Sequence, residues 1–284
     1  MKNKKIIILW HNGGRLANQL WLYINLFSYA IEKDIEIKNP SFYEYARYFK
    51  NEKQTFASFL SYFLPRKIIK LIYLGYAKIS LKINNKNSIS ADALTLLPPS
   101  TEKYPDIFKK LETGEINSLY TWGWLFRNPE GIKKHHQKII EHFKPKDTYL
   151  IKAEKHLDSL KNFKHIVGVH IRQGDYKTIN DDTFTFFQEE EVNIFLIEYL
   201  RYFNLTDKET CFVIVSDGEI SLKKFNEKLN IRNFKGNLVE DLFLLAKTDI
   251  ILGSNSSYGQ FAAYYGNIPH IAFNNKGTDW SQQK

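Results

Sequence analysis

The sequence contains a single cysteine, Cys211, so no disulfide can form within the chain. The absence of disulfides is typical of a reducing compartment. No run of 18 apolar residues occurs, which argues against a transmembrane helix. The apolar run after the basic start, residues 6–10, is too short for the core of a signal peptide. We therefore expect a cytoplasmic protein.

Several motifs that carry chemistry in other proteins are missing. There is no cluster of cysteine and histidine at zinc spacing, no Gly-x-Ser-x-Gly elbow, no Walker loop and no Asp-x-Asp pair. The nearest approach to a metal-binding acidic pair is Asp217-Gly-Glu219. We therefore predict no metal site, and neither a zinc-finger protein nor a P-loop nucleotidase.

The residues that are present favour a folded protein with a negatively charged partner. Hydrophobic residues make up 43% and aromatic residues 15% of the chain, which excludes a disordered protein. The net charge of +9 favours nucleic acid, an anionic membrane face or a phosphate-bearing small molecule. The lysines are spread singly and accompany no nucleic-acid-binding motif, so nucleic acid is not an expected partner.

One lysine-rich segment leaves two interpretations open. Pro65 divides an apolar stretch, residues 56–83, into two predicted helices, and in the second of them lysines alternate with isoleucines and leucines. A basic amphipathic helix of this kind can lie on an anionic membrane. It can equally pack against the protein in the ordinary way with its lysines in water.

The order of the predicted elements indicates an α/β fold with parallel sheets. The first half opens with a strand, a glycine turn, a helix and a second strand, and a further helix is predicted before its end. These elements are predicted at residues 6–10, 16–33, 35–38 and 129–143. The second half alternates strands at 165–171, 211–215, 249–252 and 270–273 with helices at 192–203, 221–229 and 240–246. Because Lys144–Asp147 closes the first half, we expect domains at 1–150 and 151–284.

Ligands bind outside the carboxyl ends of parallel strands, so the segments after the strands are the candidate sites. The first strand is followed by Gly13–Gln19, where two glycines and a helix N-terminus suit an anion. A strand-to-helix turn without a ligand is the alternative. The segment lacks the third glycine and the spacing of the dinucleotide-binding motif.

The strand at 165–171 is followed by Arg172-Gln-Gly-Asp175. An arginine in a glycine turn suits a diphosphate, because its planar guanidinium makes two charge-assisted hydrogen bonds. The alternative is an Arg172–Asp175 pair that only stabilises the turn. His170 adds a third ionisable side chain to this segment.

Two later loops are rich in small polar residues. Ser216-Asp217 follows the strand at 211–215, and Gly253–Gly259 leads from a strand into a helix. Loops of glycine, serine and asparagine at a helix start hold phosphates and riboses well. The same residues are also ordinary helix N-caps.

Taken together and in this order, the segments resemble the alpha-1,2-fucosyltransferases of glycosyltransferase family 11. The family's Gly-Gly-Leu-Gly-Asn-Gln, Gly-Tyr-Trp/Phe-Gln-Ser, His-x-Arg-Arg-Gly-Asp-Tyr, Ser-Asp, Glu-Asp-Leu and Asn-Ser-Thr-Phe-Ser-Trp-Trp-Ala-Ala motifs each have a counterpart. The counterparts are Gly13–Gln19, Trp122–Phe126, His170–Tyr176, Ser216-Asp217, Glu240–Leu242 and Asn255–Ala263. Each motif is weak alone, but the matches keep their order across residues 6–273.

The resemblance implies a GT-B-type glycosyltransferase with two facing Rossmann-like lobes. Lobe 1–150 would form the acceptor side and lobe 151–284 would bind the GDP-sugar donor. The enzyme would move L-fucose from GDP-fucose, with inversion and without a metal or other cofactor, to O2 of galactose in an oligosaccharide or polysaccharide precursor. The expected partners are the donor and a galactose-containing glycan, which is lipid-linked or free. Peripheral contact of the protein with the inner face of the membrane is a further expectation.

The resemblance also implies roles for individual residues. Arg172 would stabilise the departing diphosphate, and Asp175 or His170 would accept the proton of the acceptor hydroxyl. Asp217 would lie on the nucleoside side of the donor. The further donor-binding candidates are Gly14, Asn18, Gln19, Asn255, Ser256 and Ser257, together with His170 and Arg172.

Three departures from the family pattern keep the function partly open. Gln173 replaces the second arginine of the central motif, Ala17 replaces a glycine, and Gly259-Gln260 replaces Ser-Trp. The loss of one positive charge near the diphosphate leaves room for another GDP-sugar as donor. A non-catalytic protein that binds carbohydrate or a polyanion is the third interpretation.

Overall fold

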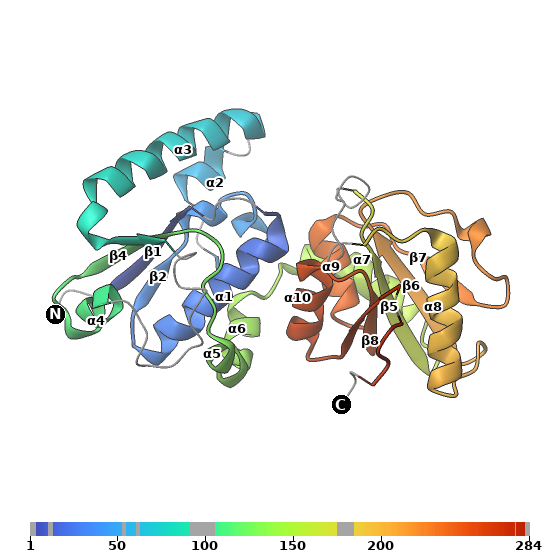
Figure 1. Ribbon diagram of the computed structural model, residues 1–284. Helices are drawn as coiled ribbons and strands as arrows, with labels where there is room; N and C mark the ends of the chain where they lie inside the picture. The colour runs from blue at the N-terminus through green and yellow to red at the C-terminus, as the bar shows by residue number, and fades with distance from the viewer. Residues whose placement is uncertain are drawn as a thin grey trace. The chain divides into compact units, whose positions relative to one another are not determined.

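The structure is a computed structural model that describes residues 4–10, 14–52, 55–60, 63–90, 106–174, 185–275 and 277–281. The chain forms two compact units, Met1–Pro145 and Lys146–Lys284. Each unit contains a parallel sheet with helices packed on it (Figure 1). The α/β class and the parallel sheets predicted from the sequence are confirmed.

The sheet of unit 1 has the strand order β2-β1-β4-β3. Its strands are β1 (Lys5–Trp10), β2 (Glu36–Lys38), β3 (Ser88–Ser90) and β4 (Ser118–Trp122). The continuous β-branched run of β1 suits a central strand, and Ile6 and Ile8 are fully buried. Because β1 and β4 are neighbours, their carboxyl ends lie at the same edge of the sheet.

The helices of unit 1 agree with the prediction as far as α3, whereas α4 was not predicted and the helix near the end of the unit differs. They are α1 (Leu16–Glu32), α2 (Phe56–Leu60), α3 (Arg66–Ile83), α4 (Asp106–Thr113), α5 (Pro129–Lys134) and α6 (His136–His142). Short 3-10 turns lie at Pro40–Phe42, Ala46–Tyr48 and Asn85–Asn87. The helix after the first strand and the two helices separated by Pro65 are confirmed.

The single helix expected at 129–143 is wrong, because the chain breaks at His135 into α5 and α6. The Nε2 atom of His135 lies 3.6 Å from Oε1 of Glu32 on α1. Asn128 caps α5 by accepting a hydrogen bond from the N–H of Gly131 and also donates to Ser28 on α1. These polar contacts hold α5 against α1. Helical periodicity in the sequence does not reveal such contacts between helices.

The sheet of unit 2 has the strand order β7-β6-β5-β8-β9. Its strands are β5 (His165–Ile171), β6 (Thr210–Ser216), β7 (Asn230–Asn233), β8 (Ile250–Gly253) and β9 (His270–Ala272). Its helices are α7 (Asp147–Asp158), α8 (Glu189–Tyr202), α9 (Leu238–Leu245) and α10 (Ser257–Gly266). Figure 1 shows α8 on one face of this sheet and α7, α9 and α10 on the other.

The helix expected at 221–229 is wrong. The structure has only a 3-10 turn at Leu222–Lys224, and β7 begins at Asn230. The backbone N–H of Asn226 donates to Asn193 Oδ1 on α8 instead of to the carbonyl of Leu222. The N–H of Ser221 donates to Glu189 Oε1 on the same helix. Contacts with a neighbouring helix therefore replace the local hydrogen bonds that a helix would need.

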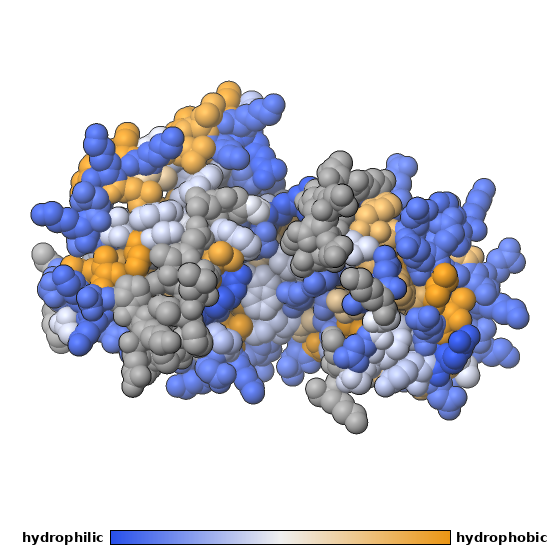
Figure 2. All heavy atoms as spheres, viewed as in Figure 1, coloured by the Kyte–Doolittle hydropathy of each residue, from blue (hydrophilic) through white to orange (hydrophobic). Residues whose placement is uncertain are grey.

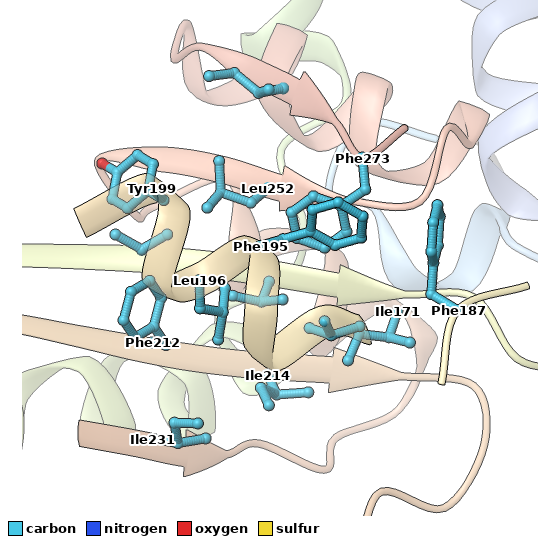
Figure 3. Close-up of a cluster of buried hydrophobic side chains, with 14 of the residues drawn as sticks. Ile171, Phe187, Phe195, Leu196, Tyr199, Phe212, Ile214, Ile231, Leu252 and Phe273 are labelled. Carbon is cyan, nitrogen blue, oxygen red and sulfur yellow. The ribbon is translucent and has the colours of Figure 1, made fainter. Parts of the chain in front are cut away.

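Successive side chains of β5 point to opposite faces of the sheet, one toward the core of unit 2 and the other toward α9 and α10. Val167, Val169 and Ile171 point to the apolar cluster under α8 (Figure 3). Gly168 faces the other way, since a Cβ there would come within 2.9 Å of Leu245 on α9. His170, two residues further on, shares the face of Gly168. The imidazole of His170 therefore points toward α9 and α10 and away from the core.

Candidate active site

The strand order of unit 2 reverses direction at β5, because the chain places β6 on one side of it and β8 on the other. In open parallel sheets, ligands bind at the carboxyl ends of the strands at such a switch point. His170 at the end of β5 is in register with Gly253 at the end of β8. The structure therefore brings together two of the predicted candidate segments, the turn after β5 and the loop at 254–257.

The two strand ends meet closely at Gly253. Its φ is +145°, and a Cβ there would lie 2.0 Å from the carbonyl oxygen of His170. Next to it, the N–H of Ser254 donates to that carbonyl at 2.9 Å. The Ser254 Oγ in turn accepts a hydrogen bond from the N–H of Arg172 at 3.0 Å. Only glycine fits this crossing, and the position of Arg172 depends on it.

The carboxylate of Asp217, which follows β6, holds the turn after β5. Its Oδ1 accepts hydrogen bonds from the N–H groups of Gln173 and Gly174 at 2.8 and 3.0 Å. Its Oδ2 lies 3.3 Å from Nε of Arg172. Arg172 thus has an acidic partner in the described part of the chain, and that partner is Asp217. Asp175, the partner considered from the sequence, lies outside the described residues.

His170 is buried and neutral. Its Nδ1 lies 3.1 Å from the Oγ of Ser256, and its ring packs on Tyr258 with 5.0 Å between centroids. Burial, followed by the positive charge of Arg172, lowers the pKa of His170 to about 3. The imidazole is only 3% exposed and its Nδ1 faces Ser256, so an acceptor hydroxyl has little access to it. The geometry therefore favours a positioning role for His170, which connects β5 to α10.

The loop at 254–257 forms the start of α10. Ser256 is the N-cap, and its Oγ accepts a hydrogen bond from the N–H of Gly259 at 3.3 Å. Asn255 accepts from Nε2 of Gln260 at 2.9 Å. The N-cap interpretation is thus correct for Ser256. The N-terminus of α10, at Ser257, carries a partial positive charge. It lies close to Arg172, whose N–H donates to Ser254 just before the helix.

A second buried histidine lies under α10. A Cβ at Gly259 would come within 2.9 Å of Nε2 of His270 and 3.6 Å of Nδ1 of His170. Glycine at this position therefore lets the helix approach both imidazoles. Burial lowers the pKa of His270 to about 4. The sequence analysis did not select His270, Ser254 or Tyr258. Ser254 and Tyr258 could have been found, because they flank the selected residues 255–257.

The Glu240-Asp-Leu242 motif has a structural role at the start of α9. The side chain of Glu240 accepts from the N–H of Asn237 at 2.7 Å, and Asp241 accepts from the N–H of Gly236 at 2.8 Å. Asn237 completes the capping box by accepting from the N–H of Glu240. The motif thus closes the loop before α9, which begins two residues earlier than the predicted helix at 240–246 because Asn237 caps it.

Gln173, the main departure from the family pattern, is buried. It is 3% exposed, and a Cβ at Gly218 would come within 2.4 Å of its Oε1. The side chain at position 173 is therefore packed against the loop after β6. A neutral amide is less costly to bury there than a guanidinium would be.

The remaining candidates lie in unit 1, at the carboxyl end of β1. Gly14 has φ +81°, and a Cβ there would clash with Asn18 at 2.6 Å. Gln19 is 3% exposed, and its Nε2 donates to the Gly14 carbonyl at 3.4 Å. Its Oε1 is buried without a hydrogen-bond partner in the described residues. The segment Trp122–Phe126 follows the neighbouring strand β4, with Gly123 at φ +96°.

Within the described residues, no three His, Cys, Asp or Glu side chains are close enough together to hold a metal ion. Both oxygens of Asp217, the acidic residue considered for such a role, face N–H groups of the protein. A search of the same residues finds no helix with the length and hydropathy needed to cross a bilayer.

The two buried histidines make stability depend on pH. Below about pH 6.5 the imidazoles of the unfolded chain bind protons, whereas His270 and His170 in the folded chain stay neutral down to about pH 4 and 3. The unfolded state then binds more protons, so the free energy of unfolding falls as the pH is lowered through this window. Each histidine contributes about 1.4 kcal/mol per pH unit.

We predict that His270→Gln flattens this dependence. The stability difference between wild type and variant should shrink steadily as urea unfolding is repeated from about pH 7 down to about pH 5. The comparison between the two proteins matters, because burial raises the pKa of Asp241 to about 6 and its contribution has the opposite sign. A difference that stays constant with pH would show that His270 does not titrate in this way.

Comparison with known proteins agrees with this geometry. No curated protein sequence matches the chain. Many solved structures share its fold at low identity, and three of them illustrate the likeness. They are a mutant of Arabidopsis thaliana FUT1 in complex with GDP (TM-score 0.59, 12% identity, 99% of this chain and 73% of that chain), NodZ alpha-1,6-fucosyltransferase co-crystallized with GDP (0.56, 12%, 98% and 98%) and POFUT1 in complex with GDP-fucose (0.52, 11%, 96% and 98%).

This likeness confirms the GT-B-type α/β fold. The family model of Glycosyl transferase family 11 matches residues 113–282, which include β4 and nearly all of unit 2. The match covers more than half of the chain and contains the turn after β5 and the start of α10. The chain therefore belongs to glycosyl transferase family 11, as its motifs indicate.

Proposed function

We propose that the protein transfers L-fucose from GDP-fucose to a hydroxyl group, O2 of galactose, in an oligosaccharide or polysaccharide precursor. The observation that carries this proposal is the position of Arg172. It lies at the switch point of the unit 2 sheet, beside Asp217 and next to the N-terminus of α10. A guanidinium and a helix N-terminus at one place suit a diphosphate.

The identity of the donor is supported by the similar structures. FUT1 and NodZ were determined with GDP, and POFUT1 was determined with GDP-fucose. We assign donor binding to unit 2, with Arg172, Ser256 and Ser257 at the diphosphate. The sequence resemblance places Asp217 on the nucleoside side. Its contacts with the turn after β5 support an additional role, which is to position Arg172.

The chemistry requires charge stabilisation at one end and proton removal at the other. As the bond between the fucose anomeric carbon and the phosphate oxygen breaks, the sugar gains oxocarbenium character and the diphosphate gains negative charge. We propose that Arg172 and the N-terminus of α10 stabilise that charge without a metal. The acceptor oxygen attacks the opposite face of the carbon, which inverts its configuration.

The proton of the acceptor hydroxyl needs a base. His170 and Asp175 are the candidates from the sequence, and the buried ring of His170 and its contact with Ser256 weigh against His170. We propose Asp175, which lies three residues after Arg172 in the chain. A nearby cation would keep its carboxylate ionised and able to accept the proton.

We assign the acceptor to unit 1. The segment Gly14–Gln19, which includes the start of α1, and the segment Trp122–Phe126 lie at the carboxyl ends of neighbouring strands. The resemblance implies donor binding for Gly14, Asn18 and Gln19, and we propose that they contribute to the acceptor side instead. The exposed Trp124 offers an aromatic face of the kind that packs on sugar rings, and Gln19 brings a buried, unsatisfied oxygen to the same edge. We place the reaction in the cytoplasm, which fits a chain whose one cysteine is buried.

A donor and acceptor panel tests the proposal directly. With a galactose-terminated disaccharide as acceptor and excess EDTA present, GDP-fucose should give GDP and a fucosylated product whose linkage NMR can assign. Preferential use of GDP-mannose would identify a transferase for another GDP-sugar. Loss of turnover in EDTA with recovery in magnesium would contradict charge stabilisation by Arg172 and the N-terminus of α10 without a metal. Glycan binding with no donor turnover would identify a non-catalytic protein.

Arg172→Ala should lower turnover by roughly 10²–10³-fold, the cost of losing one pre-organised electrostatic contact. Arg172→Lys should recover only part of the activity, since an ammonium cannot reproduce the planar guanidinium. Initial rates at saturating GDP-fucose measure both effects. Arg201→Ala, which removes an exposed arginine from α8 of the same unit, is the matched control and should keep wild-type turnover. Near-normal turnover in a folded Arg172→Ala protein would refute the assignment.

Asp175→Asn should show whether Asp175 accepts the proton or only supports the turn and Arg172. If Asp175 is the base, turnover should fall by about 10²–10⁴-fold while GDP-fucose affinity stays within a few-fold, because the amide keeps the shape and cannot accept a proton. A bracing role would lower donor affinity and thermal stability along with turnover. Asp158→Asn on the surface of α7 serves as the control. Wild-type turnover in Asp175→Asn would exclude both roles.

A further inference from the structure

Helix α3 of unit 1 is held to its sheet by one narrow face. Ile69, Tyr73 and Ala77 are buried, and the hydroxyl of Tyr73 donates to the carbonyl of Leu9 on β1 at 2.8 Å. The ring of Tyr73 also packs on Tyr43 with 4.9 Å between centroids. The three buried positions are four residues apart, so they form one stripe along the helix. The packing of α3 is thereby complete on this side.

A neighbouring side of α3, about 110° around the helix axis from the buried stripe, carries a second apolar stripe that faces solvent. Ile68, Ile72, Ile79 and Ile83 are exposed by 44 to 75%. Their spacing of four, seven and four residues places all four on one side of the helix. Figure 2 shows orange side chains running along α3, with blue side chains among them. We call these four isoleucines the outer stripe.

The outer stripe is part of a local concentration of exposed apolar groups. Of the fourteen large hydrophobic side chains exposed in the described residues, nine lie between Phe56 and Ile83. They include Phe59 and Phe63 on α2 and in its link to α3, whose ring centroids are 5.1 Å apart. Single exposed apolar residues are normal, whereas a concentration like this one marks an interaction surface.

All charged side chains in the segment that contains α2 and α3 are basic. Between Lys53 and Ala91 the sequence has seven basic residues and no acidic residue. Arg66 is paired with Glu44 at 2.6 Å. Helical geometry places Lys67, Lys78 and Lys82 along one side of the outer stripe, and none of the three has an ion pair within the described part of the chain. Apolar and basic side chains therefore share one surface.

We propose that the outer stripe of α3 and its lysines dock on an anionic lipid bilayer. A helix with an apolar face and adjacent lysines lies in the plane of a membrane interface, with the apolar groups among the acyl chains and the lysines near the headgroups. A second copy of the chain is a poorer partner, because a symmetric contact would bring two sets of lysines together. The charge pattern thus selects a negatively charged surface.

This docking would bring unit 1 to the membrane. If the proposed transfer is correct, unit 1 is the acceptor side, and the docked enzyme would act on a glycan attached to a lipid. The docking itself depends only on α3. A binding experiment can therefore fail without affecting the proposed transfer, and the reverse also holds.

The test is co-sedimentation of the full chain with vesicles. We expect the wild type to sediment with phosphatidylcholine vesicles that contain phosphatidylglycerol and to remain in solution with phosphatidylcholine alone. Binding should weaken as salt is added, since salt screens exposed charges. No binding to the anionic vesicles, or equal binding to both kinds, would overturn the proposal.

Two double variants test the lysines and the outer stripe in turn. Lys78→Glu/Lys82→Glu should lower the partition coefficient by at least about 30-fold, because each surface lysine contributes roughly a factor of five. Ile72→Glu/Ile79→Glu should lower it by at least about ten-fold, because it removes apolar groups from the interface and places carboxylates next to anionic headgroups. All four side chains are exposed, so both variants should keep wild-type thermal stability and GDP-fucose binding.

Matched controls lie in unit 2. Lys155→Glu/Lys228→Glu changes the net charge by the same amount, and Ile194→Glu alters an isoleucine that is 55% exposed on α8. Both should bind anionic vesicles like the wild type. Equal losses in the controls would mean that net charge alone drives binding, and would overturn the assignment to α3. A wild-type dimer that Ile72→Glu/Ile79→Glu converts to a monomer would also overturn it, in favour of a second copy.

A spectroscopic probe tests insertion of the stripe. Because the only cysteine, Cys211, is fully buried, a new surface cysteine can be labelled selectively. An environment-sensitive fluorophore on Ile79→Cys should shift to shorter emission wavelengths on anionic vesicles, while the same label on Ile194→Cys should not. No shift at position 79 under conditions where the protein sediments would contradict insertion of the outer stripe.

Discussion

The candidate site depends on the carboxylate of Asp217. It satisfies the N–H groups of Gln173 and Gly174 at the turn after β5 and lies beside the guanidinium of Arg172. A Cβ at Gly174 would come within 2.7 Å of this carboxylate, so the turn needs glycine there. An arginine held in this way does not have to reorganise when charge develops nearby, and pre-organisation of this kind is the main source of electrostatic catalysis. The ends of β5 and β6 therefore act as one rigid support.

The other support of the site is the contact between β5 and α10. His170 is buried, uncharged and joined to Ser256, which also caps the helix. A buried imidazole is costly unless it stays neutral, and burial under α10 next to Arg172 keeps it so. The same contact orients the N-terminus of α10 toward the end of β5. His170 thus belongs to the site through the group it positions, which agrees with its place in the central family motif.

Helix α3 shows why periodicity alone could not choose between the two interpretations of its sequence. Both of its apolar stripes repeat every three to four residues, and each would fit a helix packed on a sheet. The structure buries the stripe of Ile69 and Tyr73 and leaves the stripe of Ile72 and Ile79 in solvent. The ordinary packing and the exposed basic surface are therefore both present, on two different sides of one helix. Local pattern determined that α3 is a helix, and contact with β1 decided which side is covered.

The sequence by itself determined the alternation of strands and helices, the parallel sheets, the family and the turns at Arg172 and Ser256, because these follow from local patterns of apolar, glycine and capping residues. It did not determine the break at His135 or the loss of the helix at 221–229, where side chains of α1 and α8 compete with local hydrogen bonds. The tertiary structure also made Asp217 a partner of Arg172. Strand order brings the ends of β5 and β6 together, and spacing along the chain contains no information about that order.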